Sequence, residues 1–415
     1  MPVETIELHG HIIDSLTLPK VMDAIIELGG TFQIESIQIG RTRQDPSHVR
    51  LRIATPRQGQ MDILLPRLRD LGGHPADERD AQTQPAPRDG VFPEDFYATT
   101  NLVTHVRMAG RWVEVEHTEM DKGIMIDAAR RGGGKARTVP MAKVRRGQRI
   151  VVGFAGVRVL PADRPETQEG FSFMTSAVST EKPKLVQTRA VANLMRKTRK
   201  AGRKILLVGG PAIIHTGSGP YLVRLIEAGF VNVLFAGNAL AAHDIEQALF
   251  GTSLGVNLAE GTLARHGHQH HLRAINLVRG AGGIGPAVKK GLIRSGVMFA
   301  CQRCGVKVVL AGSIRDDGPL PDVITDTVAA QDAMRAQVPG VGLALMIGTT
   351  LHSIATGNML PAGVTTVAVD INANVVTKLL DRGSWQTLGI VTDTEPFLRE
   401  LADELCGRRK AGARG

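Results

Sequence analysis

The chain has 415 residues, of which 43% are hydrophobic and 22% are charged, with a formal net charge of +10. This length predicts two to four domains at about 100–200 residues each, and the apolar fraction excludes a wholly disordered chain. Three cysteines are too few for a secreted disulfide framework and are typical of a reducing compartment. The sequence contains neither an apolar run of about 18 residues nor a signal peptide, so we expect a mature cytoplasmic protein.

The positive net charge does not by itself indicate a nucleic-acid partner. A basic tail, residues 408–415, supplies four of the positive charges. Aromatic residues make up only 4% of the chain, which is too few for a base-stacking surface, and no zinc-finger or RNA-binding motif occurs. We therefore expect neither a nucleic-acid partner nor a membrane partner.

Residues 1–89 predict a ferredoxin-like α+β domain. Apolar and polar residues alternate over 4–12, 31–39 and 48–54, as in half-buried strands. Helical apolar spacing begins near Leu18 and ends at Gly29-Gly30, and it returns over 60–71 before Gly72-Gly73. The resulting β-α-β-β-α order is typical of that fold, and the polar segment 76–89 predicts a linker.

Residues 90–179 predict a small β-rich domain. Strand patterns cover 102–108, 112–116, 123–126 and 150–160, and glycine-containing turns separate them. The run Gly132-Gly133-Gly134-Lys135 lacks the spacing of a phosphate-binding loop, which favours an exposed turn.

Residues 180–407 predict an α/β domain with a parallel sheet covered on both faces. Six short apolar runs alternate with helical patterns such as 221–228 and 322–337. The six runs are 204–208, 231–236, 306–311, 343–347, 365–369 and 388–391.

Ligands of open parallel sheets bind beyond the carboxyl ends of the strands, so the residues that follow each run are candidates. Four of the six ends begin with glycine, and all carry small or polar residues, which suits a ligand with phosphates and sugars. Gly210 lies in the first such loop, 209–219, although a glycine there is also common in a plain tight turn. Asp370 is placed to accept a hydrogen bond from a ribose diol, or to cap the next helix.

A histidine cluster and a cysteine pair invite a metal or redox interpretation. The members are His266, His268, His270, His271 and the Cys301-x-x-Cys304 pair. The histidine spacing and the single cysteine pair do not match a zinc site, and the pair does not open a thioredoxin-like helix. We predict no metal site and expect the histidines to pack beside a loop.

Several long motifs resemble the archaeal-type ornithine cyclodeaminases and the C-terminal part of cyanobacterial arginine dihydrolase/ornithine cyclodeaminases, over residues 3–403. The motifs are HIIDSL (11–16), DPS (45–47), GNALAAHDIE (237–246), GTSLG (251–255), AGSIRDDGPLP (311–321), LHSIA (351–355), GNMLP (357–361) and VTKL (376–379). The N-terminal segment resembles the region named after lysine-ketoglutarate reductase/saccharopine dehydrogenase. The arginine-degrading domain of the cyanobacterial proteins has no counterpart here, so arginine hydrolysis is not expected.

The resemblance implies a Rossmann-like, deoxyhypusine-synthase-like domain that binds NAD, and conversion of L-ornithine to L-proline and ammonia. It implies NAD contacts only where motifs match: Asn238, Ala239, Asp317, Thr349, Thr350, Leu351, His352, Asp370 and Asp393. Two positions depart from the family pattern, Thr350 where Met is usual and Ala373 where Pro is usual, and they leave the substrate choice open.

The implied reaction is redox-neutral: a hydride leaves the substrate Cα, the δ-amine attacks the resulting imine, ammonia departs, and the hydride returns. Only about one amine in a thousand is neutral at pH 7, so a base is needed. The candidate bases are Asp316, His352, Asp244 and His243. Arg315 and Lys378 are candidate substrate-binding cations, although Arg315 beside Asp316 and Lys378 beside Asp381 can also form structural ion pairs.

Two other functions are compatible with the sequence. One is a different NAD-dependent amino-acid or polyamine reaction, of saccharopine or deoxyhypusine type. The other is a non-catalytic sensor of NAD or amino acids in which the N-terminal domain is regulatory. In either case we expect a homo-oligomer, which is common among parallel-sheet enzymes of this size.

Overall fold

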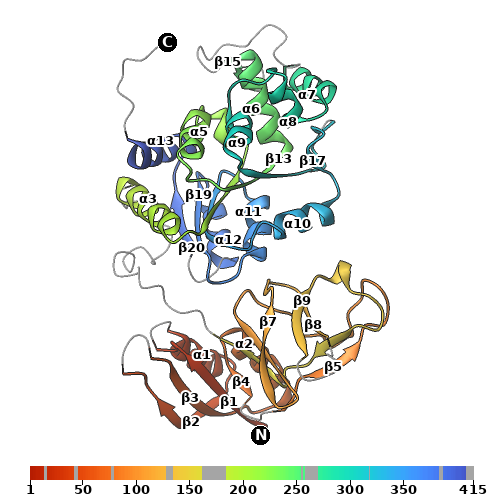
Figure 1. Cartoon of the computed structure of the whole chain (residues 1–415). Helices are drawn as coiled ribbons and strands as arrows, with labels where there is room; N and C mark the ends of the chain where they lie inside the picture. The colour runs from red at the N-terminus through yellow and green to blue at the C-terminus, as the bar shows by residue number, and fades with distance from the viewer. Residues whose placement is uncertain are drawn as a thin grey trace. The chain divides into compact units, whose positions relative to one another are not determined.

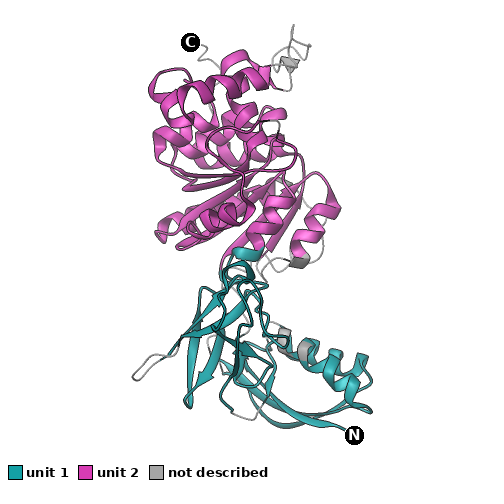
Figure 2. Cartoon of the chain, turned by 90° about the vertical axis from the view of Figure 1, so that its right-hand side faces the viewer, with its two compact units in different colours: residues 1–171, 358–363 teal, residues 172–357, 364–415 magenta. Residues whose placement is uncertain are grey.

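The computed structural model describes residues 1–13, 16–41, 45–75, 79–127, 134–160, 184–253, 256–257, 270–316, 318–382 and 387–407. The chain forms two compact units, residues 1–171 with 358–363 and residues 172–357 with 364–415 (Figure 2). The predictions made for the tail 408–415, for Gly132 and Gly133, for His266 and His268, and for Asp317 lie outside the described residues.

The first unit begins with the predicted ferredoxin-like fold. Its elements are β1 (Val3–Gly10), α1 (Thr17–Glu27), β2 (Thr31–Gln38), β3 (Ser47–Ala54), α2 (Gln58–Asp70) and β4 (His74–Pro75), and the antiparallel sheet has the order β2-β3-β1-β4. Alternation along the strands directs Ile6, Leu8 and Leu51 toward α1 and α2, where they form a buried core. The other face of the sheet carries the polar residues of these strands.

A second sheet follows in the same unit, with the order β11-β6-β7-β9-β8-β10-β5. Its strands are β5 (Gln82–Pro85), β6 (Thr104–Met108), β7 (Arg111–Glu116), β8 (Gly123–Asp127), β9 (Lys135–Val139), β10 (Arg149–Val152) and β11 (Val157–Val159), and η1 (Met141–Lys143) is a short 3₁₀ helix.

Two predictions for this part of the chain were wrong. β5 lies inside the segment predicted as a linker, where it pairs with β10. The strand predicted over 150–160 is two strands, because Gly153 and Gly156 adopt left-handed backbone conformations, with φ of 64° and 69°, and turn the chain between them.

The second unit is the predicted α/β fold with a parallel sheet, and all six predicted strands are present. They are β12 (Lys204–Gly209), β13 (Val233–Gly237), β16 (Lys307–Ala311), β18 (Val341–Ile347), β19 (Thr365–Asp370) and β20 (Thr387–Val391), and the two-residue β17 (Val323–Ile324) adds an edge strand. Figure 1 labels β13, β17, β19 and β20 of this sheet among the helices of the unit. The sheet is parallel throughout and buries an extensive apolar core. Its helices are α3 (Lys184–Lys200), α4 (Ala212–His215), α5 (Gly219–Glu227), α6 (Asn238–Phe250), α7 (His270–Ala281), α8 (Ile284–Lys289), α9 (Val297–Cys304), α10 (Thr327–Arg335), α11 (Leu351–Met359), α12 (Ala373–Arg382) and α13 (Thr394–Cys406), and β14 (Thr252–Ser253) pairs with β15 (Val256–Asn257).

The strand order places a ligand site in this sheet. It reads β17-β16-β13-β12-β18-β19-β20, so the chain moves outward from β12 in one direction and then crosses to β18 on its other side. This is the order of Rossmann folds, in which the reversal leaves a crevice beyond the carboxyl ends of the two central strands. The loops after β12 and β18 therefore flank the expected binding crevice.

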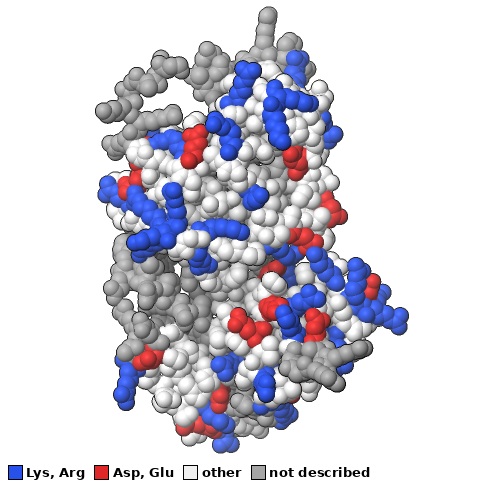
Figure 3. All heavy atoms as spheres, viewed as in Figure 1, with Lys and Arg blue, Asp and Glu red and all other residues white. Residues whose placement is uncertain are grey.

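Acidic and basic side chains mix on the face drawn in Figure 3, and basic side chains gather over α3, whose last turn carries Lys197, Arg199 and Lys200. None of the helices that the structure describes is both long and apolar enough to cross a membrane.

Candidate functional site at the carboxyl edge of the parallel sheet

Two glycines bring the backbone of the central strands unusually close together at the switch point. A Cβ atom on Gly210, directly after β12, would lie 1.9 Å from the carbonyl oxygen of Gly348, directly after β18. The Gly210 N–H donates to the carbonyl of Ile347 at 3.0 Å, which holds the two loops in this register. No side chain fits at position 210, so glycine is needed there for the two loops to pack beside the expected binding crevice.

His352 lies where the loops after β13, β16 and β18 meet. A Cβ atom on Gly237, the last residue of β13, would lie 2.9 Å from His352 Cε1. Burial lowers the pKa of His352, and the negative charge of Asp316 raises it in part. The structure thus brings together Gly237, Asp316 and His352, which are far apart in sequence, and it keeps the imidazole neutral near pH 7.

The loop after β16 is held by side-chain oxygens. Asp316 Oδ2 accepts a hydrogen bond from the Ser313 N–H at 2.8 Å, so the carboxylate shapes its own turn. Asn238, at the start of α6, is buried, and its Oδ1 accepts from the Leu320 N–H at 3.0 Å. Asn238 and Ala239 open a helix whose first N–H groups have no partner within the helix, as an anion site requires.

The predicted loop 349–352 begins α11. The Ser353 hydroxyl donates to the carbonyl of Thr349 at 2.5 Å and fixes its first turn. Thr349 and Thr350 are half-buried, whereas Leu351 is 73% exposed, so its side chain points to solvent.

Two aspartates lie in the turns at the carboxyl ends of β19 and β20: Asp370 is the last residue of β19, and Asp393 is two residues after β20. Asp370 Oδ1 accepts from the Asn372 N–H at 2.9 Å, and Asn372 in turn accepts from the Asn374 N–H in the first turn of α12. The side chain that caps α12 is therefore Asn372 and not Asp370, which was the alternative role expected for Asp370. Asp393 does cap its helix, because it precedes α13 and accepts from the Thr394 N–H at 2.6 Å.

Asp244 does not have the surroundings expected of a catalytic base. Its side chain is buried, and its two carboxylate oxygens accept from the N–H groups of Val297 and Met298, each at 2.7 Å, at the start of α9. Burial raises the pKa of Asp244 to about 6. Both oxygens hold α9 in place, and we assign Asp244 a structural role.

The two predicted cations are exposed. Within the described ranges, neither Arg315, in the loop after β16, nor Lys378, on α12, forms an ion pair with a carboxylate. The ion-pair alternative for Lys378 involves the Asp381 side chain, which lies outside the described residues.

Sequence reasoning missed a buried polar network behind the strand ends. Glu246 is fully buried on α6; its Oε2 lies 2.8 Å from His243 Nδ1, and its Oε1 accepts from the Thr252 hydroxyl at 2.9 Å. The His215 ring, from α4, contacts the His243 ring at a centroid distance of 4.8 Å. The available signal was a glutamate three residues after His243, on the same side of a helix that is rich in buried residues.

The histidine and cysteine motif is divided between elements. His270 and His271 begin α7, and the Thr252 hydroxyl lies 2.9 Å from His270 Nδ1. Cys301 is buried and Cys304 is exposed on α9, and both are free thiols.

Comparisons with known proteins identify the family. Residues 189–401 match the family described as arginine dihydrolase ArgZ-like, C-terminal, Rossmann fold; residues 103–187 match its first region, and residues 3–102 match the LOR/SDH bifunctional enzyme conserved region. A protein named ornithine cyclodeaminase from Methanothermobacter thermautotrophicus is 48% identical over 406 residues, which are 98% of each chain. The chain belongs to the archaeal-type ornithine cyclodeaminase family. The family resemblance expected from the motifs is confirmed.

Solved structures of cyanobacterial relatives share the fold. The apo structure of ArgZ, an arginine dihydrolase, has a TM-score of 0.82 at 36% identity, and it covers 98% of this chain and 58% of ArgZ. AgrE in ternary complex with ornithine and NAD+ has a TM-score of 0.53 at 41% identity, and it covers 98% of this chain and 57% of AgrE. This archaeal-type cyclodeaminase homologue thus spans just over half the length of either cyanobacterial protein.

Proposed function

We propose that this protein is an NAD-dependent ornithine cyclodeaminase that converts L-ornithine to L-proline and ammonia. The observation that carries the proposal is the glycine-lined switch point with His352 beside it, in a chain 41% identical to AgrE, whose structure holds ornithine and NAD+. The close approach of Gly210 and Gly348 joins the loops after β12 and β18, which flank the place where ligands of such sheets bind.

The residues at this edge fit NAD. A Cβ atom on Gly210 would collide with the Gly348 carbonyl, and one on Gly237 would collide with the His352 ring, so these glycines let the loops pack closely at the edge of the sheet where ligands bind. The first turn of α6, from Asn238 and Ala239, and the turn 349–352 provide N–H donors for the pyrophosphate. Among the described residues, no backbone N–H donates to Asp370 Oδ2, which suits a ribose hydroxyl, and Asp393 lies after the neighbouring strand.

When bound, NAD supplies hydride acceptance and return at the substrate carbon. The residues of the chain must then bind the amino acid, exclude water and move protons. His352 is the base that we favour, because burial keeps its imidazole neutral near pH 7 and ready to take a proton from an ammonium group. Asp316 stabilises the imidazolium that forms, through its negative charge.

Substrate binding needs a cation for the α-carboxylate. Arg315 follows β16 in the same loop as Asp316, and its guanidinium is exposed and unpaired among the described carboxylates. A guanidinium binds a carboxylate through two parallel N–H donors. We assign Arg315 this role, with Lys378 as a second candidate.

The test is an assay of proline formation from ornithine with a small, fixed amount of NAD. We expect many turnovers per NAD, release of ammonia, and no steady accumulation of NADH. Stoichiometric NADH would instead indicate a dehydrogenase. Tight NAD binding without turnover of any diamino acid would indicate a sensor.

A further inference from the structure

A second cluster of chemically active side chains lies in the first unit, on the face of the ferredoxin-like sheet opposite α1 and α2. Strand register creates it. His9 on β1 pairs directly with His48 on β3, and Glu7 on β1 pairs with Arg50 on β3 and with His74 on β4. Because side chains alternate along a strand, Glu7 and His9 point to the same face, and their cross-strand partners join them there.

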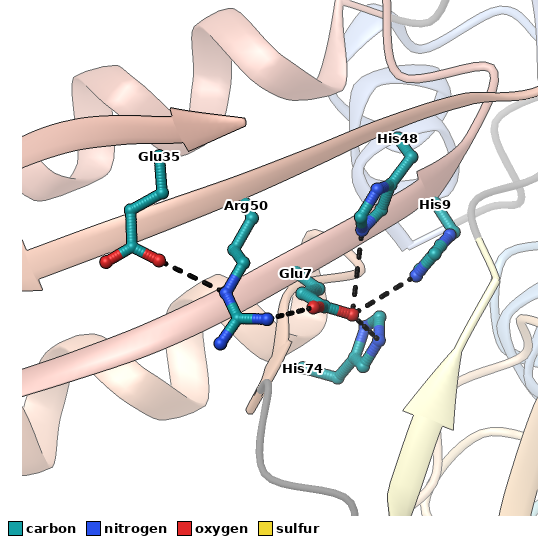
Figure 4. Close-up of polar contacts among 6 residues, drawn as sticks. All are labelled: Glu7, His9, Glu35, His48, Arg50 and His74. Carbon is teal, nitrogen blue, oxygen red and sulfur yellow. Dashed lines mark hydrogen bonds and ion pairs between the residues drawn. The ribbon is translucent and has the colours of Figure 1, made fainter. Parts of the chain in front are cut away.

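The imidazoles converge on one carboxylate oxygen (Figure 4). Glu7 Oε2 lies 3.4 Å from His9 Nε2, 3.6 Å from His48 Nε2 and 3.9 Å from His74 Nε2. The ligand atoms of Glu7, His9 and His48 all lie within 4.8 Å of one another. The His9 and His48 rings stack at a centroid distance of 4.1 Å, which places the two side chains next to each other on this face of the sheet.

We propose that Glu7, His9, His48 and His74 bind one divalent transition-metal ion, with Zn2+ as the best fit. Three imidazole nitrogens and one carboxylate oxygen are a donor set that suits zinc and its first-row neighbours.

The spacing agrees with this coordination. Zinc binds nitrogen and oxygen ligands at about 2.0–2.2 Å, so the ligands of a tetrahedral site lie about 3.3–3.6 Å apart. The contacts of Glu7 Oε2 at 3.4, 3.6 and 3.9 Å are close to this spacing, whereas the nitrogen atoms of His9 and His48 lie within 4.8 Å of each other and His74 must approach them for all four ligands to bind one ion. A carboxylate oxygen has about two acceptor sites, and three imidazole nitrogens within 3.9 Å of Glu7 Oε2 exceed that number.

A neighbouring cation orients the Glu7 carboxylate. Arg50 occupies the other oxygen of Glu7 at 3.3 Å and also contacts Glu35 at 3.1 Å, which fixes the carboxylate and leaves Oε2 to the histidines.

The ion would connect three strands. β4 has only two residues and pairs with β1 through Ile6–Pro75 and Glu7–His74. A metal bound by Glu7 and His9 of β1, His48 of β3 and His74 of β4 would fasten this short edge strand to the sheet. We therefore expect metal binding to stabilise the first unit, independently of NAD binding in the second.

The experiment uses the full chain, stripped with a chelator and exchanged into a non-coordinating buffer. Cobalt(II) is titrated first, because tetrahedral Co2+ has intense visible absorption bands, and ZnCl2 is then titrated by calorimetry. We expect one equivalent at this site, displacement of Co2+ by Zn2+, and a higher Tm with metal.

Variants assign the site. His9→Gln and His48→Gln each should weaken binding at least about 100-fold, since loss of even an outer partner of a metal ligand costs 10–100-fold. His117→Asn, in the exposed turn after β7, is the matched control and should bind like the parent. Circular dichroism checks that the variants are folded, and if either histidine variant proves misfolded, Glu7→Gln replaces it. Unchanged metal binding in the folded histidine variants, or no binding by the parent chain, overturns the proposal.

Discussion

The backbone of Gly210 approaches the carbonyl oxygen of Gly348 so closely that a Cβ atom at position 210 would lie 1.9 Å from it. These residues follow β12 and β18, the two strands between which the sheet reverses its order. The approach joins the two loops that flank the crevice and leaves no room for a side chain. A single methyl group at position 210 must therefore displace one loop.

Gly210→Ala should weaken NAD binding at least tenfold and destabilise the protein by about 1–3 kcal/mol, the usual penalty of forcing an extra methyl group into a packed position. Calorimetry with NAD and urea unfolding measure both effects. Gly280→Ala is the matched control: an added Cβ there meets no atom within 4 Å, and alanine stabilises a helix relative to glycine. Unchanged NAD affinity in Gly210→Ala would argue against the switch point as the cofactor site.

Asp316→Asn should move the acidic limb of the pH–rate profile to lower pH. The charge of Asp316 raises the pKa of His352, whereas burial holds it below the usual 6.5, so removing the charge lowers this pKa further. A base must be neutral to act, and a lower pKa keeps it neutral to lower pH. The measurement is kcat/KM for proline formation across pH 5–8. Asp332→Asn, on α10, serves as the control. If the acidic limb of Asp316→Asn stays at the same pH as in the parent, the charge of Asp316 does not act on a catalytic His352.

Asp244 should make folding less favourable as pH rises. Its pKa is raised from 3.8 to about 6 by burial, so the folded state holds the proton more tightly than the unfolded chain. Stability from this group is therefore full below about pH 4 and is lost as pH rises through 6, by up to about 3 kcal/mol. Urea unfolding of the parent chain and of Asp244→Asn at several pH values isolates the effect, because the asparagine cannot titrate.

The same variant tests the structural role of Asp244. Asparagine keeps one acceptor for the two N–H groups of α9, so we expect a pH-independent loss of stability with turnover largely retained. If Asp244→Asn has the same free energy of unfolding as the parent chain but a turnover number about 1000-fold lower, then Asp244 acts in catalysis and not in stabilising the fold.

Glu246→Ala should destabilise the second unit by about 1–3 kcal/mol, because His243 and the Thr252 hydroxyl would lose a buried acceptor. Chemical unfolding measures the change. Glu227→Ala, at the exposed end of α5, is the control and should stay within about 0.5 kcal/mol of the parent. Equal effects of the two substitutions would show that the buried network contributes nothing.

Much of the second unit could be predicted because its strands are apolar on both faces. Continuous apolar runs such as those of β12 and β18 are typical of parallel strands covered by helices, and glycine after a strand marks a loop near a ligand. The division of 150–160 into two strands was not predictable from alternation, because the break depends on glycines at two particular backbone positions. β5 was hidden for a related reason, since a four-residue edge strand has a polar composition.

The sequence could not predict which side chains contact each other in the folded protein. The motif containing His243, Asp244 and Glu246 places them within one helical turn, yet Asp244 faces α9, whereas Glu246 faces His243 and Thr252. Which side of α6 meets which neighbour is a matter of packing. The convergence of Glu7, His9, His48 and His74 depends likewise on strand register, which a one-residue slip would reverse.

By itself, the sequence determined the family, the parallel sheet and the loops that follow its strands, because hydrophobic periodicity and local motifs are properties of neighbouring residues. Only the tertiary structure decided that Gly237, Asp316 and His352 share one place, that Asp244 is a helix-binding carboxylate, and that three imidazoles from three strands meet around one carboxylate oxygen. Those contacts join residues far apart along the chain, and their geometry arises only when the strands pair and the helices pack.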